Sequence, residues 1–243
     1  MLSISTTEGL SILDSITIKR TPPLVPPCLT LTHKVVASTW SSDNAFLFLA
    51  SLQTIQRYDP SSNSLEEFYS NIGEGDISHL VFRDKGSLIF SSGEIVHLLD
   101  CGSIPKVSHT FDTHKSMITS LSLSNDASLL SSTSSTAAHV HNLSLASHTV
   151  LKGLPLGSQP ITASVFHPQL RTRLLLGVGK QLVVYDTTRP SGPMRTIALN
   201  ETNSTTHSGD IIAIACSPFS KTLVAVATTG GNVVLIDLEK EKG

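Results

Sequence analysis

The sequence predicts an all-β fold that is built from one repeated unit of short strands. A short apolar strand that closes on Asp or Asn recurs along the 243-residue chain at intervals of 45, 41, 42, 44 and 51 residues. The closing residues are Asp14, Asp59, Asp100, Asn142, Asp186 and Asp237. No segment shows an apolar period of 3.6 residues, so no long helix is expected. A period of about 40–45 residues with four short strands per unit is typical of a β-propeller.

Each unit follows the same order of elements. A polar loop, often with His near its end, leads into an alternating strand, a tight turn, a second apolar strand, a small-residue turn and the closing strand. The expected first strands are Val36–Trp40, Ile77–Phe82, Ile118–Leu123, Ile161–Phe166 and Ile211–Cys216. The expected closing strands are Leu10–Asp14, Thr54–Asp59, Glu94–Asp100, Ala138–Asn142, Gln181–Asp186 and Asn232–Asp237. In the last unit the Gly230-Gly231 pair favours a hairpin, because both positions tolerate positive φ.

The repeat predicts one propeller domain over residues 1–243, with a partial blade at 1–20 and units ending near 59, 100, 142, 186 and 237. That makes about five and a half blades with three strands in each unit. A seven-blade ring needs about 290 residues at this period. The expectation is therefore a truncated seven-blade ring, with surface connections at 21–27 and 200–206.

Composition restricts the function classes. The net charge is −2 with no basic stripe, which argues against nucleic acid as a partner. No run approaches the ~20 apolar residues that cross a bilayer, so no membrane partner is expected. The three cysteines have no C-x-x-C spacing, which favours a reducing, cytoplasmic location and argues against a zinc site.

No catalytic constellation stands out in the sequence. A G-x-S-x-G elbow is absent, and Gly177–Lys180 lacks the spacing of a phosphate loop. His139 and His141 lie two apart on a strand and share a face, but no further ligand stands nearby, so they are interpreted as exposed or loosely packed. The closing Asp residues are interpreted as structural caps of turn amides. No enzyme activity, metal, cofactor or small-molecule substrate is expected.

The pattern resembles the WD-repeat family over nearly the whole chain. In that family a His before the first strand, a Ser or Thr of the second strand, a turn Asp and a Trp before the closing Asp form a hydrogen-bonded network. The resemblance implies two partial networks, His114 with Ser132 and His207 with Thr228. No Trp-Asp dipeptide occurs, and the lone Trp40 stands on a first strand. The positions before the closing residues hold Leu13, Tyr58, Leu99, His141, Tyr185 and Ile236.

Several blocks are also similar to one group of WD-repeat proteins, the γ-tubulin-ring-complex targeting factors of centrosomes and spindle poles. The similar blocks include Thr39–Leu47, Asp112–Lys115, Leu174–Gly177 and Cys216–Pro218. This resemblance implies a non-catalytic adaptor that recruits γ-tubulin complexes for microtubule nucleation at the spindle pole. In that group a C-terminal helical region binds the γ-tubulin complexes, and no such region is expected in these 243 residues.

Two other functions remain open at this stage. One is a WD-repeat scaffold subunit of another intracellular complex, in trafficking, ubiquitin ligation or ribosome assembly. The other is a propeller enzyme with a central site, which needs converging polar side chains where Ile118, Ile161 and Ile211 stand. Thr21, in the segment Lys19-Arg20-Thr21-Pro22, is a candidate phosphorylation site.

Overall fold

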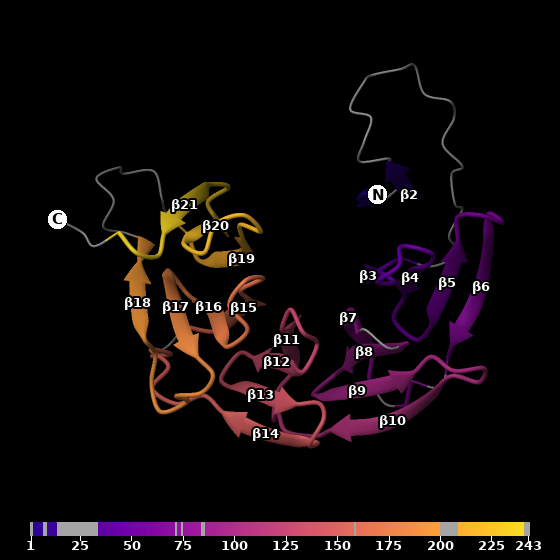
Figure 1. Ribbon diagram of the computed structural model, residues 1–243, viewed down its shortest axis with the longest axis horizontal. Helices are drawn as coiled ribbons and strands as arrows, with labels where there is room; N and C mark the ends of the chain where they lie inside the picture. The colour runs from indigo at the N-terminus through magenta and orange to yellow at the C-terminus, as the bar shows by residue number, and fades with distance from the viewer. Residues whose placement is uncertain are drawn as a thin grey trace, which may run out of the picture. The chain divides into compact units, whose positions relative to one another are not determined.

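The fold consists of antiparallel β-sheets joined in chain order (Figure 1). The computed structural model describes residues 2–6, 9–13, 34–70, 72–73, 75–83, 86–157, 159–199 and 209–240, the first two ranges by their backbone only. Asp14, Thr21 and His207 lie outside these residues. The chain forms two compact units. One consists of Met1–Ser92 with Leu99–Val107, and the other of Gly93–Leu98 with Ser108–Gly243.

The strands form one pair, four sheets of four strands and one sheet of three. The pair is β1 (Leu2–Thr6) and β2 (Gly9–Leu13). The first two larger sheets are β3 (Ala37–Trp40), β4 (Leu47–Ala50), β5 (Ile55–Asp59), β6 (Ser64–Tyr69), and β7 (Ile77–Arg83), β8 (Ser87–Ser92), β9 (Ile95–Asp100), β10 (Lys106–Phe111). The next two are β11 (Ile118–Leu123), β12 (Leu129–Ser134), β13 (Ala138–Asn142), β14 (Ser147–Val150), and β15 (Ile161–Phe166), β16 (Arg173–Val178), β17 (Gln181–Asp186), β18 (Arg195–Ala198). The last sheet is β19 (Ile211–Cys216), β20 (Leu223–Thr228) and β21 (Val233–Asp237).

Each expected closing residue in the described chain is the last residue of a third strand. These residues are Asp59, Asp100, Asn142, Asp186 and Asp237. The sequence pattern did not locate the fourth strands β6, β10, β14 and β18, which it treated as polar loops. Those strands carry mostly polar side chains that are exposed or half-buried, as in β14, where all four residues are exposed. An outer strand that buries little apolar surface leaves no period-2 signal.

A bulge recurs at the start of the first strand in four sheets. The register shifts directly after Ile77, Ile118, Ile161 and Ile211. A bulge adds one residue to a strand and increases its local twist, so the same irregularity at the same place marks the sheets as copies of one unit. The four isoleucines are buried, at 2%, 4%, 0% and 0% exposure, and they serve as core residues.

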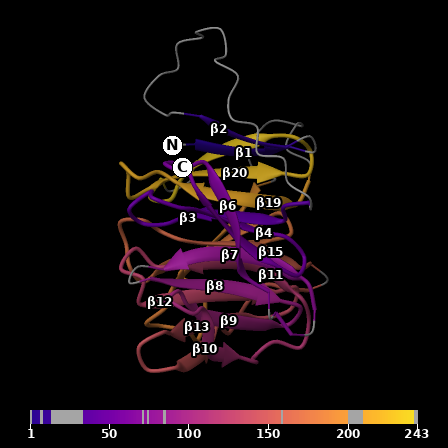
Figure 2. The same cartoon turned by 90° about the vertical axis from the view of Figure 1, so that its right-hand side faces the viewer.

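In the first unit the sheet of β3–β6 packs on strand β7 (Figure 2). The buried cluster there includes Phe48, Leu88 and Phe90, with Phe48 stacked on Phe82 at 5.6 Å between ring centroids. The Phe82 amide donates a hydrogen bond to Thr39 Oγ1 at 3.2 Å, which joins β7 to β3. Trp40 is half-buried against Leu47, Leu49 and Tyr58.

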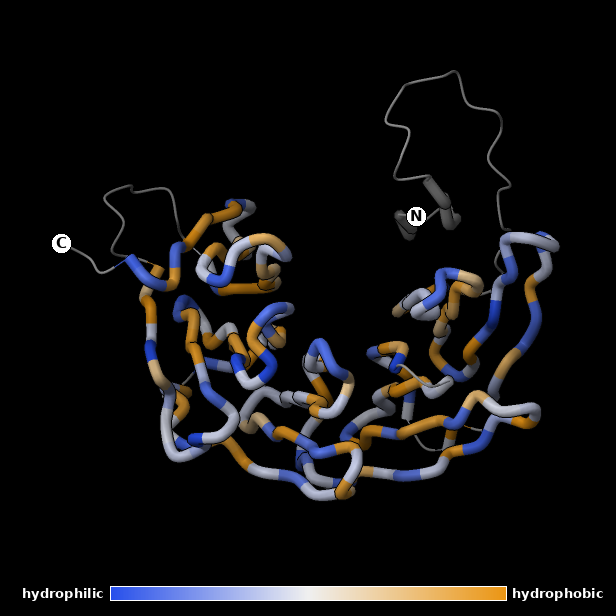
Figure 3. Tube along the Cα trace, in the orientation of Figure 1, coloured by the Kyte–Doolittle hydropathy of each residue, from blue (hydrophilic) through white to orange (hydrophobic). Residues whose placement is uncertain are grey.

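In the second unit each sheet packs face to face on the next. One core cluster lies between β11–β14 and β15–β17 and includes Val140, Leu176 and Tyr185. Another joins β16–β17 to β19–β21, whose strands are largely apolar in Figure 3. Hydrogen bonds between sheets accompany the packing: the Phe166 amide donates to Ser122 Oγ at 2.8 Å, and the Thr162 hydroxyl donates to the Ile211 carbonyl. The chain is therefore an all-β protein with the architecture of a partial β-propeller.

Candidate functional site

The closing Asp and Asn residues act as caps of the turns that follow them. Asp59 Oδ1 accepts a hydrogen bond from the Ser61 amide at 2.8 Å, and Asp186 Oδ1 accepts one from the Thr188 amide at 3.0 Å. The side chains of Asp100, Asn142 and Asp237 accept the equivalent bond from the residue two positions on. A side chain that satisfies its own turn in this way shapes the backbone. These residues therefore support the turns in which they stand.

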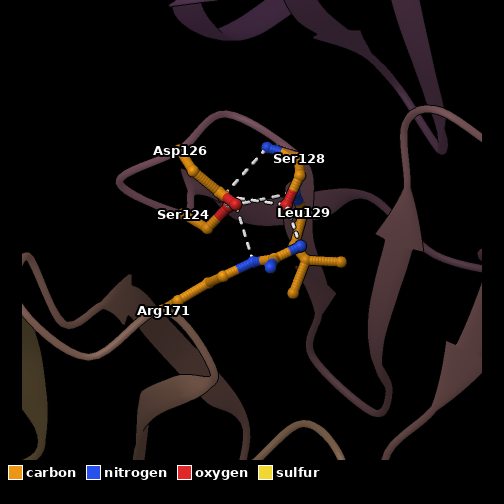
Figure 4. Close-up of polar contacts among 5 residues, drawn as sticks. All are labelled: Ser124, Asp126, Ser128, Leu129 and Arg171. Atoms are coloured by element: carbon orange, nitrogen blue, oxygen red, sulfur yellow. Dashed lines mark hydrogen bonds and ion pairs between the residues drawn. The ribbon is translucent and has the colours of Figure 1, made fainter.

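Three turns between first and second strands are joined into one surface, here called the turn surface: residues 124–128, 167–172 and 217–222. Arg171 Nε lies 2.6 Å from Asp126 Oδ2, and Arg171 Nη2 donates to Ser128 Oγ at 3.0 Å (Figure 4). On the other side, Gln169 Nε2 donates to the Pro218 carbonyl at 2.5 Å. One turn thus holds both of its neighbours.

Asp126 is the centre of the first of these turns. Its Oδ1 accepts hydrogen bonds from the Ser124 hydroxyl at 2.7 Å and the Ser128 hydroxyl at 2.8 Å, and Ser124 Oγ accepts the Leu129 amide at 2.9 Å (Figure 4). Burial alone would raise the pKa of Asp126, but these hydrogen bonds and the charge of Arg171 lower it below its ordinary value. The carboxylate is therefore ionised at neutral pH and fixes the geometry of the turn.

Ala127 in this turn has a backbone conformation that favours glycine. Its φ is +52°, and Asn44, at the same place in the turn after β3, has φ +57°. The left-handed region costs most L-residues about 1–2 kcal/mol, while Asn and Gly adopt it readily. Replacing Ala127→Gly is expected to raise the free energy of unfolding by about 0.5–1 kcal/mol.

Chemical denaturation monitored by circular dichroism measures this gain. The matched control is Ala198→Gly in strand β18, where φ is negative and the same exchange should lower stability by about 0.5–1 kcal/mol. Equal losses at both positions would contradict the assigned strain at Ala127.

Phe219 is the most exposed large apolar side chain of the turn surface. It is 94% exposed, beside the exposed Pro218 and close to Lys221. Its backbone amide donates to Ser217 Oγ at 3.2 Å, and the Ser220 amide donates to the same oxygen at 3.1 Å, so the turn that carries the ring is held by its own hydrogen bonds. A fixed turn with an exposed aromatic ring suits recognition, because an aromatic anchor buries much apolar area at little entropic cost.

Five histidines of the same unit lie close together and are here called the histidine cluster: His109, His114, His139, His141 and His148. The His114 and His139 rings lie 4.4 Å apart between centroids, and His148 lies 5.4 Å from His139 and 5.9 Å from His141. His114, His139 and His141 are 4%, 6% and 0% exposed. The expectation that His139 and His141 are exposed or loosely packed was therefore wrong, because His114, from the loop before β11, packs on His139 and Phe111, at the end of β10, packs on His141 at 4.6 Å between ring centroids.

Ser132 connects two members of the histidine cluster. Its hydroxyl lies 2.8 Å from His114 Nε2 and 2.7 Å from His141 Nε2. Since a hydroxyl has one proton, it donates to one ring and accepts from the other. The resemblance to WD-repeat proteins paired His114 with Ser132, and the structure adds His141, which stands at the position of the missing Trp. In the WD-repeat network a Trp indole nitrogen contacts the Ser or Thr hydroxyl; here His141 Nε2 makes the corresponding contact with Ser132.

The buried members of the histidine cluster are neutral at physiological pH. Burial, together with the neighbouring His139 and His148, lowers the pKa of His114 to about 4. Burial and His148 lower the pKa of His139 to about 4, and burial with the other four rings lowers the pKa of His141 to about 3. The Nδ1 atoms of all three are buried without a hydrogen-bond partner in the described part of the chain, so a second ring proton has no acceptor there.

The histidine cluster lacks the geometry of a metal centre. Among the described residues no group of three or more His, Cys, Asp or Glu side chains is arranged to hold a metal ion.

The free thiols Cys101 and Cys216 are half-buried, and burial raises the pKa of each to about 11. Both are therefore protonated at neutral pH and poorly nucleophilic.

No protein-family model matches the chain, and no curated protein sequence matches it. The described residues contain no helix with the length and hydropathy of a membrane span.

Sequence reasoning did not find Arg171, Gln169 or Phe219, because their roles depend on contacts between turns about 45 residues apart. The fold and the two sites define the class as an all-β repeat protein of propeller type.

Proposed function

We propose that this chain is a non-catalytic WD-repeat scaffold that docks protein partners on the turn surface. The observation that carries the proposal is the set of three joined turns, 124–128, 167–172 and 217–222, which present Phe219 on a braced frame. The exposed Arg171 and Asp126 supply charged groups on the two neighbouring turns of the same surface. A central aromatic anchor within a polar border is the usual composition of a protein-binding patch.

The more specific form of the proposal is an adaptor that recruits γ-tubulin complexes for microtubule nucleation. It is supported by the sequence blocks that resemble the spindle-pole targeting factors, Thr39–Leu47 and Cys216–Pro218 among them. The last of these blocks adjoins Phe219, so the resemblance and the exposed anchor meet at one turn. The proposed location is the cytoplasm, at the centrosome or spindle pole, and the proposed partners are proteins of the γ-tubulin complex or the pole.

The test is localisation and co-purification of the tagged chain in dividing cells. The wild-type chain is expected at spindle poles, with proteins of the pole in the purified material. Phe219→Ala is expected to weaken the interaction about thirtyfold, the change for a hot spot of about 2 kcal/mol. Leu145→Ala is the matched control, since Leu145 is 73% exposed in the turn after β13 and lies outside the turn surface.

The outcomes separate the two levels of the proposal. A uniform signal through mitosis, without proteins of the spindle pole in the purified material, would reject the adaptor and leave a scaffold of another complex. Wild-type binding by Phe219→Ala would reject the turn surface as the docking site. Unchanged circular dichroism of both variants shows that the fold is intact.

A further inference from the structure

A pocket of about 260 Å³ lies in the first unit, beside the turn between β3 and β4, and is here called the phenylalanine pocket. Asp43 and Arg57 supply its charged groups, and its walls are formed mainly by four aromatic rings, Phe46, Phe48, Phe68 and Phe82. The Phe48 ring is 3% exposed and lies 5.2 Å from Phe68 and 5.6 Å from Phe82 between centroids. The rings are therefore packed on one another and the pocket is preformed.

Asp43 carries the charge of this pocket that lacks a counterion. Its Oδ1 accepts hydrogen bonds from the Ser41 hydroxyl at 2.5 Å and the Ala45 amide at 3.0 Å, and these bonds lower the pKa of the Asp43 carboxyl. Among the described residues no cation lies within ion-pair distance of Asp43. Arg57, by contrast, donates from Nε to Glu66 Oε1 at 2.7 Å. The charge left over in the described part of the pocket is therefore negative.

The rings of the phenylalanine pocket already hold one guanidinium group. Arg57 Cζ lies 4.8 Å from the centroid of Phe46 and 5.4 Å from the centroid of Phe68. A cation within about 6 Å of an aromatic centroid is attracted by the negative face of the ring. The walls of the pocket therefore suit a planar cationic side chain as well as an apolar one.

The turn beside the phenylalanine pocket has a counterpart in the second unit. In each turn a serine Oγ accepts a hydrogen bond from the amide five residues on, from Phe46 at 3.0 Å and from Leu129 at 2.9 Å. The aspartates that stand two residues after these serines, Asp43 and Asp126, therefore occupy the same place in the repeat. Phe46 and Leu129 each line a pocket beside their own turn.

The second unit also shows what this place in the repeat binds. Asp126 Oδ2 lies 2.6 Å from Nε of Arg171, which comes from the next turn and lines the pocket there. Asp43 has no such arginine in the described part of the chain. The same carboxylate position is thus filled by a guanidinium in one unit and open to an arginine in the other.

We infer that the phenylalanine pocket binds an arginine side chain of a partner protein, with the guanidinium on Asp43 and the alkyl stem against the rings. Arginine fits better than lysine, because its guanidinium is planar, stacks on aromatic faces and presents a fork of donors to a carboxylate. At about 260 Å³ the pocket is smaller than the roughly 300–1,000 Å³ of small-molecule sites, so one side chain fills it. The site belongs to the first unit and is distinct from the turn surface, which belongs to the second.

An NMR titration of the ¹⁵N-labelled 243-residue chain with the blocked peptide acetyl-Ala-Arg-Ala-amide tests the inference. Saturable shifts of the Ala45 and Phe46 amide signals are expected, with a dissociation constant on the order of millimolar because one side chain supplies the contacts. The same peptide with citrulline in place of arginine keeps the shape and lacks the charge. It is expected to bind about three- to fivefold more weakly, the effect of one exposed ion pair.

Asp43→Asn isolates the carboxylate. It removes the charge but keeps the Oδ1 that accepts from Ser41 and Ala45, so the turn is expected to stay intact. The arginine peptide should bind this variant about three- to fivefold more weakly, and the citrulline peptide should bind it as it binds the wild type. Asp237→Asn is the matched control, since Asp237 caps its own turn by accepting the Glu239 amide at 3.1 Å and lies in the second unit. It should bind both peptides like the wild type.

Each contrary outcome overturns the inference. Equal affinity of the wild type for the two peptides, which depends on no variant, would show that the pocket does not recognise the charge. Unchanged Ala45 and Phe46 signals, or shifts confined to residues 124–128, would place the arginine elsewhere. Wild-type affinity of Asp43→Asn would remove Asp43 from the site, and an equal loss in Asp237→Asn would reduce the effect to net charge.

Discussion

Acidification from about pH 7.5 to about pH 5 is expected to destabilise the second unit by several kcal/mol. The pKa of His114 and His139 is lowered to about 4 and that of His141 to about 3, whereas an unfolded histidine titrates near 6.5. The unfolded chain therefore takes up protons first as the pH falls. The stability is fully present above pH 6.5 and is lost progressively between about 6.5 and 4. At pH 5 each histidine lowers the free energy of unfolding by up to about 2 kcal/mol.

Denaturation curves at several pH values, read by circular dichroism, measure this loss. His139→Leu removes one titrating ring without removing a hydrogen bond that the structure shows, and the difference in stability between pH 7.5 and 5 should shrink by about 1–2 kcal/mol. Val140→Ala is the control on the same strand. It is 6% exposed and does not titrate, so it should lower stability equally at every pH. A pH dependence that is the same in His139→Leu as in the wild type would show that the cluster is not its source.

Gly177→Ala is expected to lower the free energy of unfolding by about 1–3 kcal/mol. A Cβ at residue 177 would lie 2.6 Å from Ile211 Cγ2 and 3.1 Å from Ile211 Cβ. Gly177 stands in β16 and Ile211 in β19, so the missing side chain allows the two sheets to approach. In a strand without this contact the same exchange is favourable, because Gly loses more backbone entropy on folding. The sign of the change thus reports the sheet-to-sheet contact.

A double-mutant cycle with Ile211→Ala isolates that contact. Ile211 is fully buried, and Ile211→Ala alone should cost about 2–5 kcal/mol. Because it removes Cγ2, Gly177→Ala in the Ile211→Ala background should cost at least about 1 kcal/mol less than in the wild type. Additive effects would mean that the two sheets do not meet at this point.

The repeat, the strand class and most strand bounds could be read from the sequence, because each depends on local chemistry. A closing Asp such as Asp186 caps its own turn two residues on, so its role is local and visible in the chain. The apolar pattern of inner strands such as β16 and β17 reflects burial on both faces. The outer strands left no such pattern, since a half-exposed strand like β14 needs only backbone partners.

The candidate sites were decided by tertiary contacts. His139 and His141 read from the sequence as a surface pair, but His114 and Phe111 pack on them, and only this burial lowers their pKa values. Arg171 meets Asp126 across 45 residues of chain, and the turn that carries Phe219 is held by Gln169 from a turn about 50 residues earlier. The sequence by itself determined the unit that repeats, since hydrogen bonding and alternation act over a few residues. Which faces of that unit are covered depends on how sheets stack, and this left His114, His139 and His141 buried.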